Sequence, residues 1–220
     1  MKDTDEKLKK DIIDQLYWDN RIDVSDIKVD VDNHRVTLSG AVPNHSASEA
    51  ALMTAWGTKG VVQVLNHLVV EYPTSADVPP DPEIKSRIEK LLSWSKAIYG
   101  QDVQVSVDAG VVELEGTVDA YWKKIKIEEL ASHVFGVVKV LGKLIIVPGR
   151  DIKDEVIARE IGSALDRIRF DADELDVKVK DGIVTLLGII PSWHTQQLIL
   201  NCVHNTFGVR TIKNELVISQ

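Results

Sequence analysis

Apolar and polar residues follow one pattern that is repeated three times along the chain. Each copy begins with apolar residues three or four positions apart, the spacing of an amphipathic helix: Leu8, Ile12 and Leu16, then Ile84, Ile88 and Leu91, then Ile157, Ile161 and Leu165. Two short alternating stretches follow, joined by Asp, Asn or Gly residues that suit a tight hairpin turn. A second helical stretch and a final apolar stretch complete each copy. The pattern predicts an α+β fold of three tandem αββαβ modules, each with a three-stranded mixed sheet and two helices on one face.

Two glycines recur at fixed places in the three modules. The first lies in the second strand-like stretch, and the second follows 20 positions later, directly before a valine. The pairs are Gly40 and Gly60, Gly116 and Gly136, and Gly188 and Gly208. We expect the first glycine to permit a bulge or the close approach of a helix. We expect the second glycine to end the second helix.

The copies define three domains and two junctions. We expect domains at residues 1–72, 83–148 and 149–220, here called modules 1, 2 and 3. Residues 73–82 contain four prolines and predict an extended, semi-rigid linker. The second junction is much shorter, so modules 2 and 3 are expected to be coupled more tightly than modules 1 and 2.

The repeated motif Val-x-Leu-x-Gly-x-Val, followed by Gly-Val and then Asn-x-Leu-x-Val, resembles the BON domain, the module of osmotically inducible periplasmic proteins and other bacterial envelope proteins. The resemblance covers nearly the whole chain, with Gly142 in place of the usual Asn in module 2. It implies an αββαβ sandwich without a known catalytic centre, roles in osmotic or envelope stress and, in some members, binding of anionic phospholipids. A cytoplasmic relative binds potassium, so a potassium-binding sensor of osmotic stress is the alternative function.

Composition narrows the classes of partner and compartment. The formal net charge of −8 argues against nucleic-acid binding, which requires a basic surface. No apolar run approaches the roughly 20 residues of a transmembrane helix. The polar, acidic start of the chain has no features of a signal peptide, so we expect a cytoplasmic protein, or a periplasmic one if a leader has been removed.

The sequence contains no motif of a known class of enzyme. Cys202 is the only cysteine, which excludes an intrachain disulfide, and its apolar neighbours indicate a small buried side chain. The six histidines lie at unrelated places without the spacing of metal ligands. We therefore expect no catalytic activity, no cofactor and no metal site.

One short segment at the start of the second helix of module 2 combines aromatic rings with lysines: Tyr121, Trp122, Lys123, Lys124 and Lys126. Rings at headgroup depth and ammonium groups near phosphates suit an anionic membrane surface. The segment is therefore a candidate contact with phospholipid or with a protein partner. The alternative is an exposed helical turn whose aromatic side chain covers the sheet edge. Trp193 is placed like Tyr121 in module 3, which favours a shared packing role.

The sheet face without helices is expected to be open in each module. In module 3 its outward residues include Leu187, Ile189 and Val217. Open apolar faces usually mark contacts, so we expect this face to be buried against another module or against a second chain in a homo-oligomer. The expected function is a non-catalytic stress-response protein that contacts phospholipid headgroups, envelope components or proteins.

Overall fold

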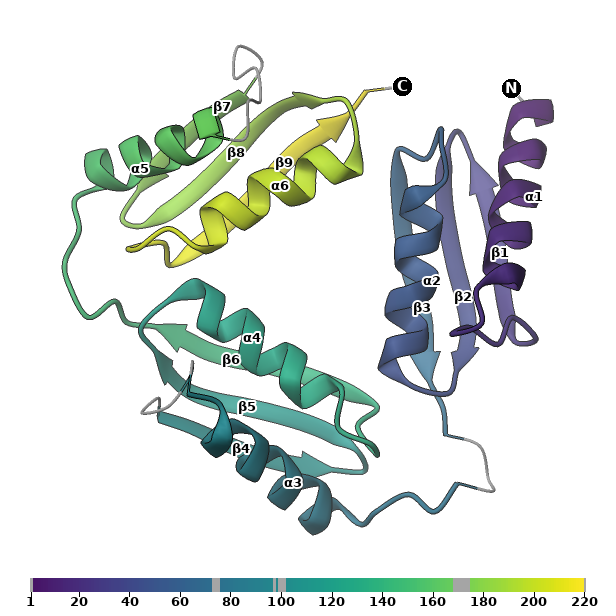
Figure 1. Ribbon diagram of the computed structural model, residues 1–220, viewed down its shortest axis with the longest axis horizontal. Helices are drawn as coiled ribbons and strands as arrows, with labels where there is room; N and C mark the ends of the chain where they lie inside the picture. Colours follow the sequence, from purple (N-terminus) through teal and green to yellow (C-terminus); the bar gives the residue numbers. More distant parts are fainter. Residues whose placement is uncertain (1, 73–75, 97, 99–101, 168–174, 220) are drawn as a thin grey trace.

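A computed structural model describes residues 2–72, 76–96, 98, 102–167 and 175–219, arranged as three αββαβ modules (Figure 1). Module 1 contains α1 (Lys2–Trp18), β1 (Ile27–Asp32), β2 (Arg35–Val42), α2 (His45–Gly57) and β3 (Gln63–Val70). Module 2 contains α3 (Asp81–Trp94), β4 (Asp102–Asp108), β5 (Val111–Val118), α4 (Tyr121–Ser132) and β6 (Lys139–Ile146). Module 3 contains α5 (Asp154–Arg167), β7 (Leu175–Lys180), β8 (Ile183–Ile190), α6 (Trp193–His204) and β9 (Thr211–Ile218). The predicted α+β fold is confirmed, although residues 73–75 of the predicted linker lie outside the described residues.

Each module has a sheet of three strands in the same order and register. The central strand pairs antiparallel with the preceding strand and parallel with the last one, so the sheet is mixed. In module 2, for example, Leu114 lies between Val105 and Gly142. The equivalent pairings in the other two sheets place Leu38 and Leu186 at the same point.

The core of each module lies between its sheet and its two helices. Ile84, Ile88 and Ile127 of module 2 are fully buried against the inward residues of β5. The third core residue of α3 is Leu92, one position later than the predicted Leu91, because a buried helix face takes residues four positions apart. Burial of such side chains stabilises each module by about 1.5–3 kcal/mol per residue.

A carboxylate at the start of each first helix fixes the hairpin turn of the same module. The carboxylate of Asp81 accepts hydrogen bonds from the backbone N–H groups of Ala109 (2.8 Å) and Gly110 (3.0 Å). Both turn residues have positive φ, at 48° and 76°, which points their N–H groups toward the helix. The same two bonds join Asp5 to Asn33 and His34, and Asp154 to Asp181 and Gly182.

The first repeated glycine is required by a close approach of backbone, not of a helix. Gly116 has φ of +124°, and a Cβ atom there would collide with the carbonyl oxygen of Asp102, at the start of the neighbouring strand. Gly40 meets the carbonyl oxygen of Asp26 in the same way. The prediction of an approaching helix is therefore wrong.

The second repeated glycine does not cap the second helix. Helix α4 ends at Ser132 with His133 as its cap, and Gly136 follows in the turn that leads to β6. Gly136 has φ of +102°, and a Cβ atom there would lie 2.6 Å from Cδ1 of Ile84 in the first helix. The positive φ favours glycine at this position, and the short distance to Ile84 shows that the chain passes close to α3.

Replacing Asp81 with Ala should lower the free energy of unfolding of module 2 by about 1–2 kcal/mol, because two turn N–H groups lose their acceptor. Hydrogen exchange of the Ala109 and Gly110 amides should become faster in the same variant. Glu83→Ala is the matched control, since Glu83 only forms an exposed ion pair with Arg87 on the same helix. Equal exchange rates in the two variants would contradict a role for Asp81 in fixing the turn.

Candidate functional site

The three second helices lie on the inner side of the molecule and face a common centre (Figure 1). The last strands β3, β6 and β9, which form one edge of each sheet, also lie on this inner side, and β1, β4 and β7 lie outside. The centre is therefore lined by elements of all three modules. Their mutual contacts are the candidate site for any function that needs the modules to act together.

Aromatic stacking joins the start of two of the second helices to the end of another. Trp193, the first residue of α6, stacks on Trp56 near the end of α2, with ring centroids 5.9 Å apart and planes at 12°. Tyr121, the first residue of α4, stacks on His204 at the end of α6, with centroids 5.1 Å apart. Trp193 and Tyr121 thus share a packing role, as their equivalent positions indicated.

The third contact of this kind joins module 1 to module 2 through charged and titratable groups. Glu49 of α2 lies 3.2 Å from Nε2 of His133, the residue that caps α4. His45, the first residue of α2, is close enough to His133 for their charges to interact. The start of α2 therefore meets the end of α4, and the three helices form a closed head-to-tail ring.

Tyr72, which follows β3, adds a second connection between modules 1 and 2. Its hydroxyl accepts a hydrogen bond from the N–H group of Gly136 (2.9 Å) and donates one to the carbonyl of Val137 (3.2 Å). Its ring packs edge-on against Phe135, with centroids 4.9 Å apart. Direct contacts thus hold modules 1 and 2 together despite the proline-rich linker. The expectation of weaker coupling was based on the linker alone and did not include these contacts.

Burial at the centre shifts the pKa of two of its histidines. Removal from water lowers the pKa of His45, and the nearby charge of His133 adds to this effect while Glu49 opposes it. Removal from water also lowers the pKa of His204, which lies against Tyr121. The lowered pKa favours the neutral form of both rings at neutral pH.

In the segment of aromatic rings and lysines at the start of α4, the lysine side chains form bonds with residues of their own module. Lys123 pairs with Asp119 (2.8 Å), and Lys126 pairs with Glu129 (3.0 Å). Lys124 donates a hydrogen bond to the carbonyl of Leu144 (3.2 Å). Trp122 lies half-buried beside Lys123. Contact with phospholipid phosphates would compete with these bonds, so it stays a prediction.

The open sheet face of module 3 is not covered by another module. Leu187 is half-buried, whereas Ile189 and Val217 are 55% and 61% exposed. The equivalent residues Val69 and Ile145 of the other modules are exposed as well. Burial against another module of the same chain is therefore wrong for this face. Burial against a second chain stays a prediction, which sedimentation of the protein in solution would test.

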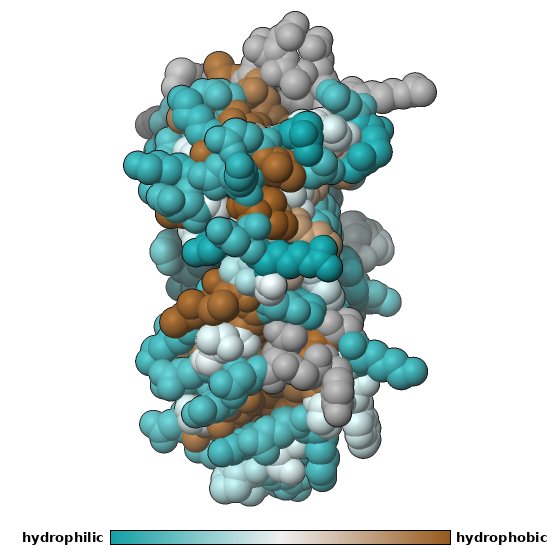
Figure 2. All heavy atoms as spheres, turned by 90° about the vertical axis from the view of Figure 1, so that its left-hand side faces the viewer, coloured by the Kyte–Doolittle hydropathy of each residue, from teal (hydrophilic) through white to brown (hydrophobic). Residues whose placement is uncertain are grey.

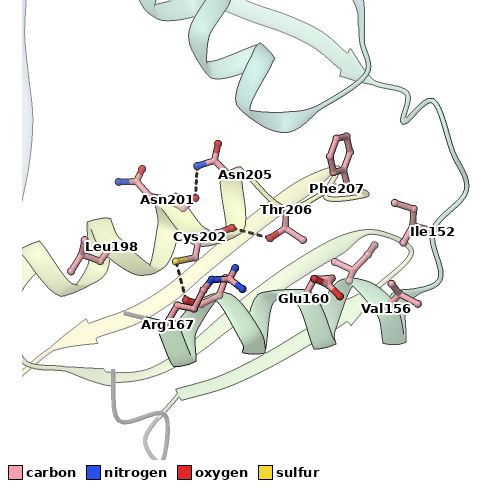
Figure 3. A pocket seen from close by; sticks show the side chains of 12 residues that line it. Ile152, Val156, Glu160, Arg167, Leu198, Asn201, Cys202, Asn205, Thr206 and Phe207 are labelled. Carbon is pink, nitrogen blue, oxygen red and sulfur yellow. Dashed lines mark hydrogen bonds between the residues drawn. The ribbon is translucent and has the colours of Figure 1, made fainter. Parts of the chain in front are cut away.

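An apolar groove between α5 and α6 is a site that the sequence did not reveal (Figure 3). It has a volume of about 490 Å³ and includes Cys202, Ala164 and Arg167 among its lining residues. Cys202 is only partly buried, contrary to the expectation, and burial raises the pKa of its thiol. Figure 2 shows that apolar side chains on this side of the molecule reach the surface in separate patches, with polar side chains between them.

The described residues contain no helix long and apolar enough to cross a membrane and no group of three or more metal-ligating side chains. One group of titratable side chains that the fold brings together from two modules consists of His45, Glu49 and His133. They join two modules and do not line one of the clefts described here.

Three copies of one αββαβ fold, joined through their second helices, define a tandem-module protein, and comparison with known families identifies the module. The family model of the BON domain matches residues 4–72, 80–148 and 153–220. The chain belongs to the BON domain family, and the resemblance seen in the repeated motif is confirmed.

Two curated relatives carry the same module. The chain is 33% identical to osmotically-inducible protein Y of Escherichia coli over 141 residues, which cover 63% of this chain and 68% of the relative. It is 31% identical to the outer membrane lipoprotein DolP of Haemophilus influenzae over 110 residues, or 50% of this chain. That alignment spans only 56% of DolP.

Among solved structures, CdsD, a structural protein of the type III secretion system of Chlamydia trachomatis, is similar over 97% of this chain and 92% of its own. The sequence identity is 16% and the TM-score is 0.27. A similarity of this size bears on neither the module arrangement nor the function of the present protein.

Replacing Trp193 with Ala should open the ring between modules 1 and 3, because Trp193 and Trp56 form the stacked contact that joins these two modules directly. Loss of a stacked aromatic pair costs about 0.5–1.5 kcal/mol beyond the area it buries. Small-angle scattering should show a larger radius of gyration, and circular dichroism should show unchanged helix content. Trp18→Ala is the control, because Trp18 is 82% exposed. An unchanged radius in Trp193→Ala would refute the role of this stack.

Acid should weaken the closed arrangement. Because burial lowers the pKa of His45 and His204, an opened molecule binds protons more readily than a closed one as the pH falls below the ordinary histidine value. Scattering between about pH 7.5 and about pH 5 should therefore show expansion in acid. His204→Phe keeps an aromatic ring against Tyr121 without titrating, and it should reduce the expansion. A radius independent of pH in the wild-type protein would contradict this expectation.

Proposed function

We propose that this protein is a non-catalytic binding protein of the bacterial cell envelope that acts during osmotic or envelope stress. The family shown by the sequence, together with relatives named as osmotically inducible and as an outer membrane lipoprotein, supports this role. The same relatives favour an envelope compartment over the cytoplasmic one expected from the start of the chain.

The observation that carries the proposal is the closed ring of second helices. Trp193 on Trp56, Tyr121 on His204 and Glu49 beside His133 fix the three modules as one body. Modules that are fixed relative to one another present their surfaces in a constant geometry. Several weak contacts with one partner can then add up without a further loss of conformational entropy in this protein. This arrangement suits a protein that binds an extended surface better than one that encloses a substrate.

We further propose that the surface contacted is anionic phospholipid, through the start of α4. Tyr121 is held by His204, which orients this end of the helix, and Trp122 and the three lysines lie beside it. Near an anionic membrane each lysine contributes about 1 kcal/mol. Exchange of Asp119 and Glu129 for lipid phosphates is the step that this proposal requires, and it makes binding sensitive to salt.

The test is sedimentation with vesicles of phosphatidylglycerol and of phosphatidylcholine. Changing Lys123, Lys124 and Lys126 together to Glu should weaken binding to the anionic vesicles by roughly tenfold or more. The control makes the same charge change on module 1, at Lys7, Lys10 and Lys28. An equal loss in both variants, or no binding by the wild-type protein, would overturn the lipid proposal. Thermal unfolding in matched potassium and sodium chloride tests the alternative function, because a potassium site would raise Tm in potassium alone.

A further inference from the structure

The groove between α5 and α6 exists because two facing positions hold small side chains. Ala164 on α5 and Cys202 on α6 line it, and the Cys202 thiol reaches the carbonyl of Ala164 at 3.8 Å. Its other apolar lining residues lie on the two helices and in the segments that flank them, as Figure 3 shows for Val156, Leu198 and Phe207. The result is a groove with mainly apolar walls that is partly open to solvent.

Modules 1 and 2 differ from module 3 in the equivalent space. The turn-fixing carboxylates Asp5, Asp81 and Asp154 align the first helices of the three modules. By that alignment Ala164 corresponds to Leu91 of module 2, and the repeated glycines make Cys202 correspond to Leu130. Both leucines are partly buried, and Leu130 packs against the module core. Bulky side chains therefore stand in module 2 where module 3 has the groove.

In module 1 a hydrogen bond between polar side chains connects the two corresponding helices. Gln15 corresponds to Ala164, and its side-chain oxygen accepts a hydrogen bond from the Thr58 hydroxyl at 3.1 Å. A space of about 580 Å³ remains between α1 and α2, and it is lined by Trp18 together with polar side chains that include Asp14 and Asp19. Among the described lining residues, the space in module 1 has two carboxylates and no cation, so apolar walls combined with a positive charge are particular to module 3.

Arg167 gives the groove a positive charge at one end. It takes the place of Trp18 and Trp94 of the other modules, and its charge acts on the Cys202 thiol. Figure 3 shows its side chain extending over the groove beside Cys202. Within the described part of the chain no carboxylate pairs with Arg167, whereas the other charged lining residue, Glu160, has Arg159 at 3.8 Å.

We propose that this groove binds one molecule of a single-chain anionic amphiphile, with its hydrocarbon chain between α5 and α6 and its head group on Arg167. A volume of about 490 Å³ lies within the usual range of ligand sites, roughly 300–1,000 Å³. The apolar walls match a hydrocarbon chain, and a carboxylate head supplies the hydrogen-bond acceptors that a guanidinium prefers. The ligand is a monomer from solution and not a bilayer, and the site is separate from the start of α4.

Titration calorimetry with fatty acids below their micelle concentration tests this proposal. Each methylene buried in an apolar site strengthens binding by roughly fourfold, so dodecanoate should bind roughly tenfold or more tighter than decanoate. Arg167→Gln should weaken dodecanoate binding by roughly tenfold and leave binding of neutral dodecanol unchanged. Lys180→Gln, a charge removal in module 3 outside the groove, is the control and should leave both affinities unchanged.

The residues of module 2 supply a variant that fills the groove. Ala164→Leu combined with Cys202→Leu should abolish binding of both dodecanoate and dodecanol, while vesicle binding through α4 stays as in the wild-type protein. If this variant does not fold, the wild-type protein still decides the question, because bound dodecanoate should slow alkylation of Cys202 by a maleimide at least threefold.

Several results would overturn the proposal. They are dodecanoate binding that persists in the folded double-leucine variant, affinity that does not depend on chain length or on Arg167, and alkylation of Cys202 at the same rate with and without dodecanoate. Loss of vesicle binding with fatty-acid binding intact would instead reject the proposed contact with membranes and leave the groove as a ligand site.

Discussion

The stack of Trp193 on Trp56 is the contact on which the shape of the molecule depends. Modules 1 and 2 and modules 2 and 3 are joined by the chain itself, but modules 1 and 3 are not neighbours in sequence. Their stack turns a linear string of domains into a closed ring. Because the linkers already keep the side chains of Trp193 and Trp56 close together, a stacking interaction of modest strength is enough to hold modules 1 and 3 in contact. Every property that requires a fixed geometry of the three modules follows from this closure.

Three equivalent positions with different chemistry give the ring three different joints. The first residue of the second helix is His45 in module 1, Tyr121 in module 2 and Trp193 in module 3. The stacked side chains Trp193 and Trp56 are not titratable, whereas the contacts at the other two joints include histidines. The repeated fold therefore keeps one docking geometry, while the residue at this position decides whether a joint responds to pH. A single substitution at this position could change that response.

The elements and the topology were predictable from the sequence because helix and strand spacings recur in three copies, and each copy supports the interpretation of the others. The roles of the repeated glycines were not predictable from the sequence. Asp102 lies close to Gly116 and Ile84 lies close to Gly136, and no local sequence pattern indicates such distances across the fold. The groove was missed for the same reason. The sequence does contain a signal for the groove, because Ala164 and Cys202 stand at the positions that Leu91 and Leu130 occupy in module 2. This signal becomes visible only when the repeats are aligned by Asp81 and Asp154.

The inward position of β3, β6 and β9 has a consequence for how the protein behaves at high concentration. An edge strand carries unpaired backbone groups and can recruit a strand of another chain, which leads to aggregates. With these three edges turned toward the ring centre, strand exchange between molecules through them must wait until the ring opens. The contacts among the second helices thus restrict strand exchange at this edge of each sheet, whereas the outer edges formed by β1, β4 and β7 are open to it when a cell loses water and its proteins become crowded.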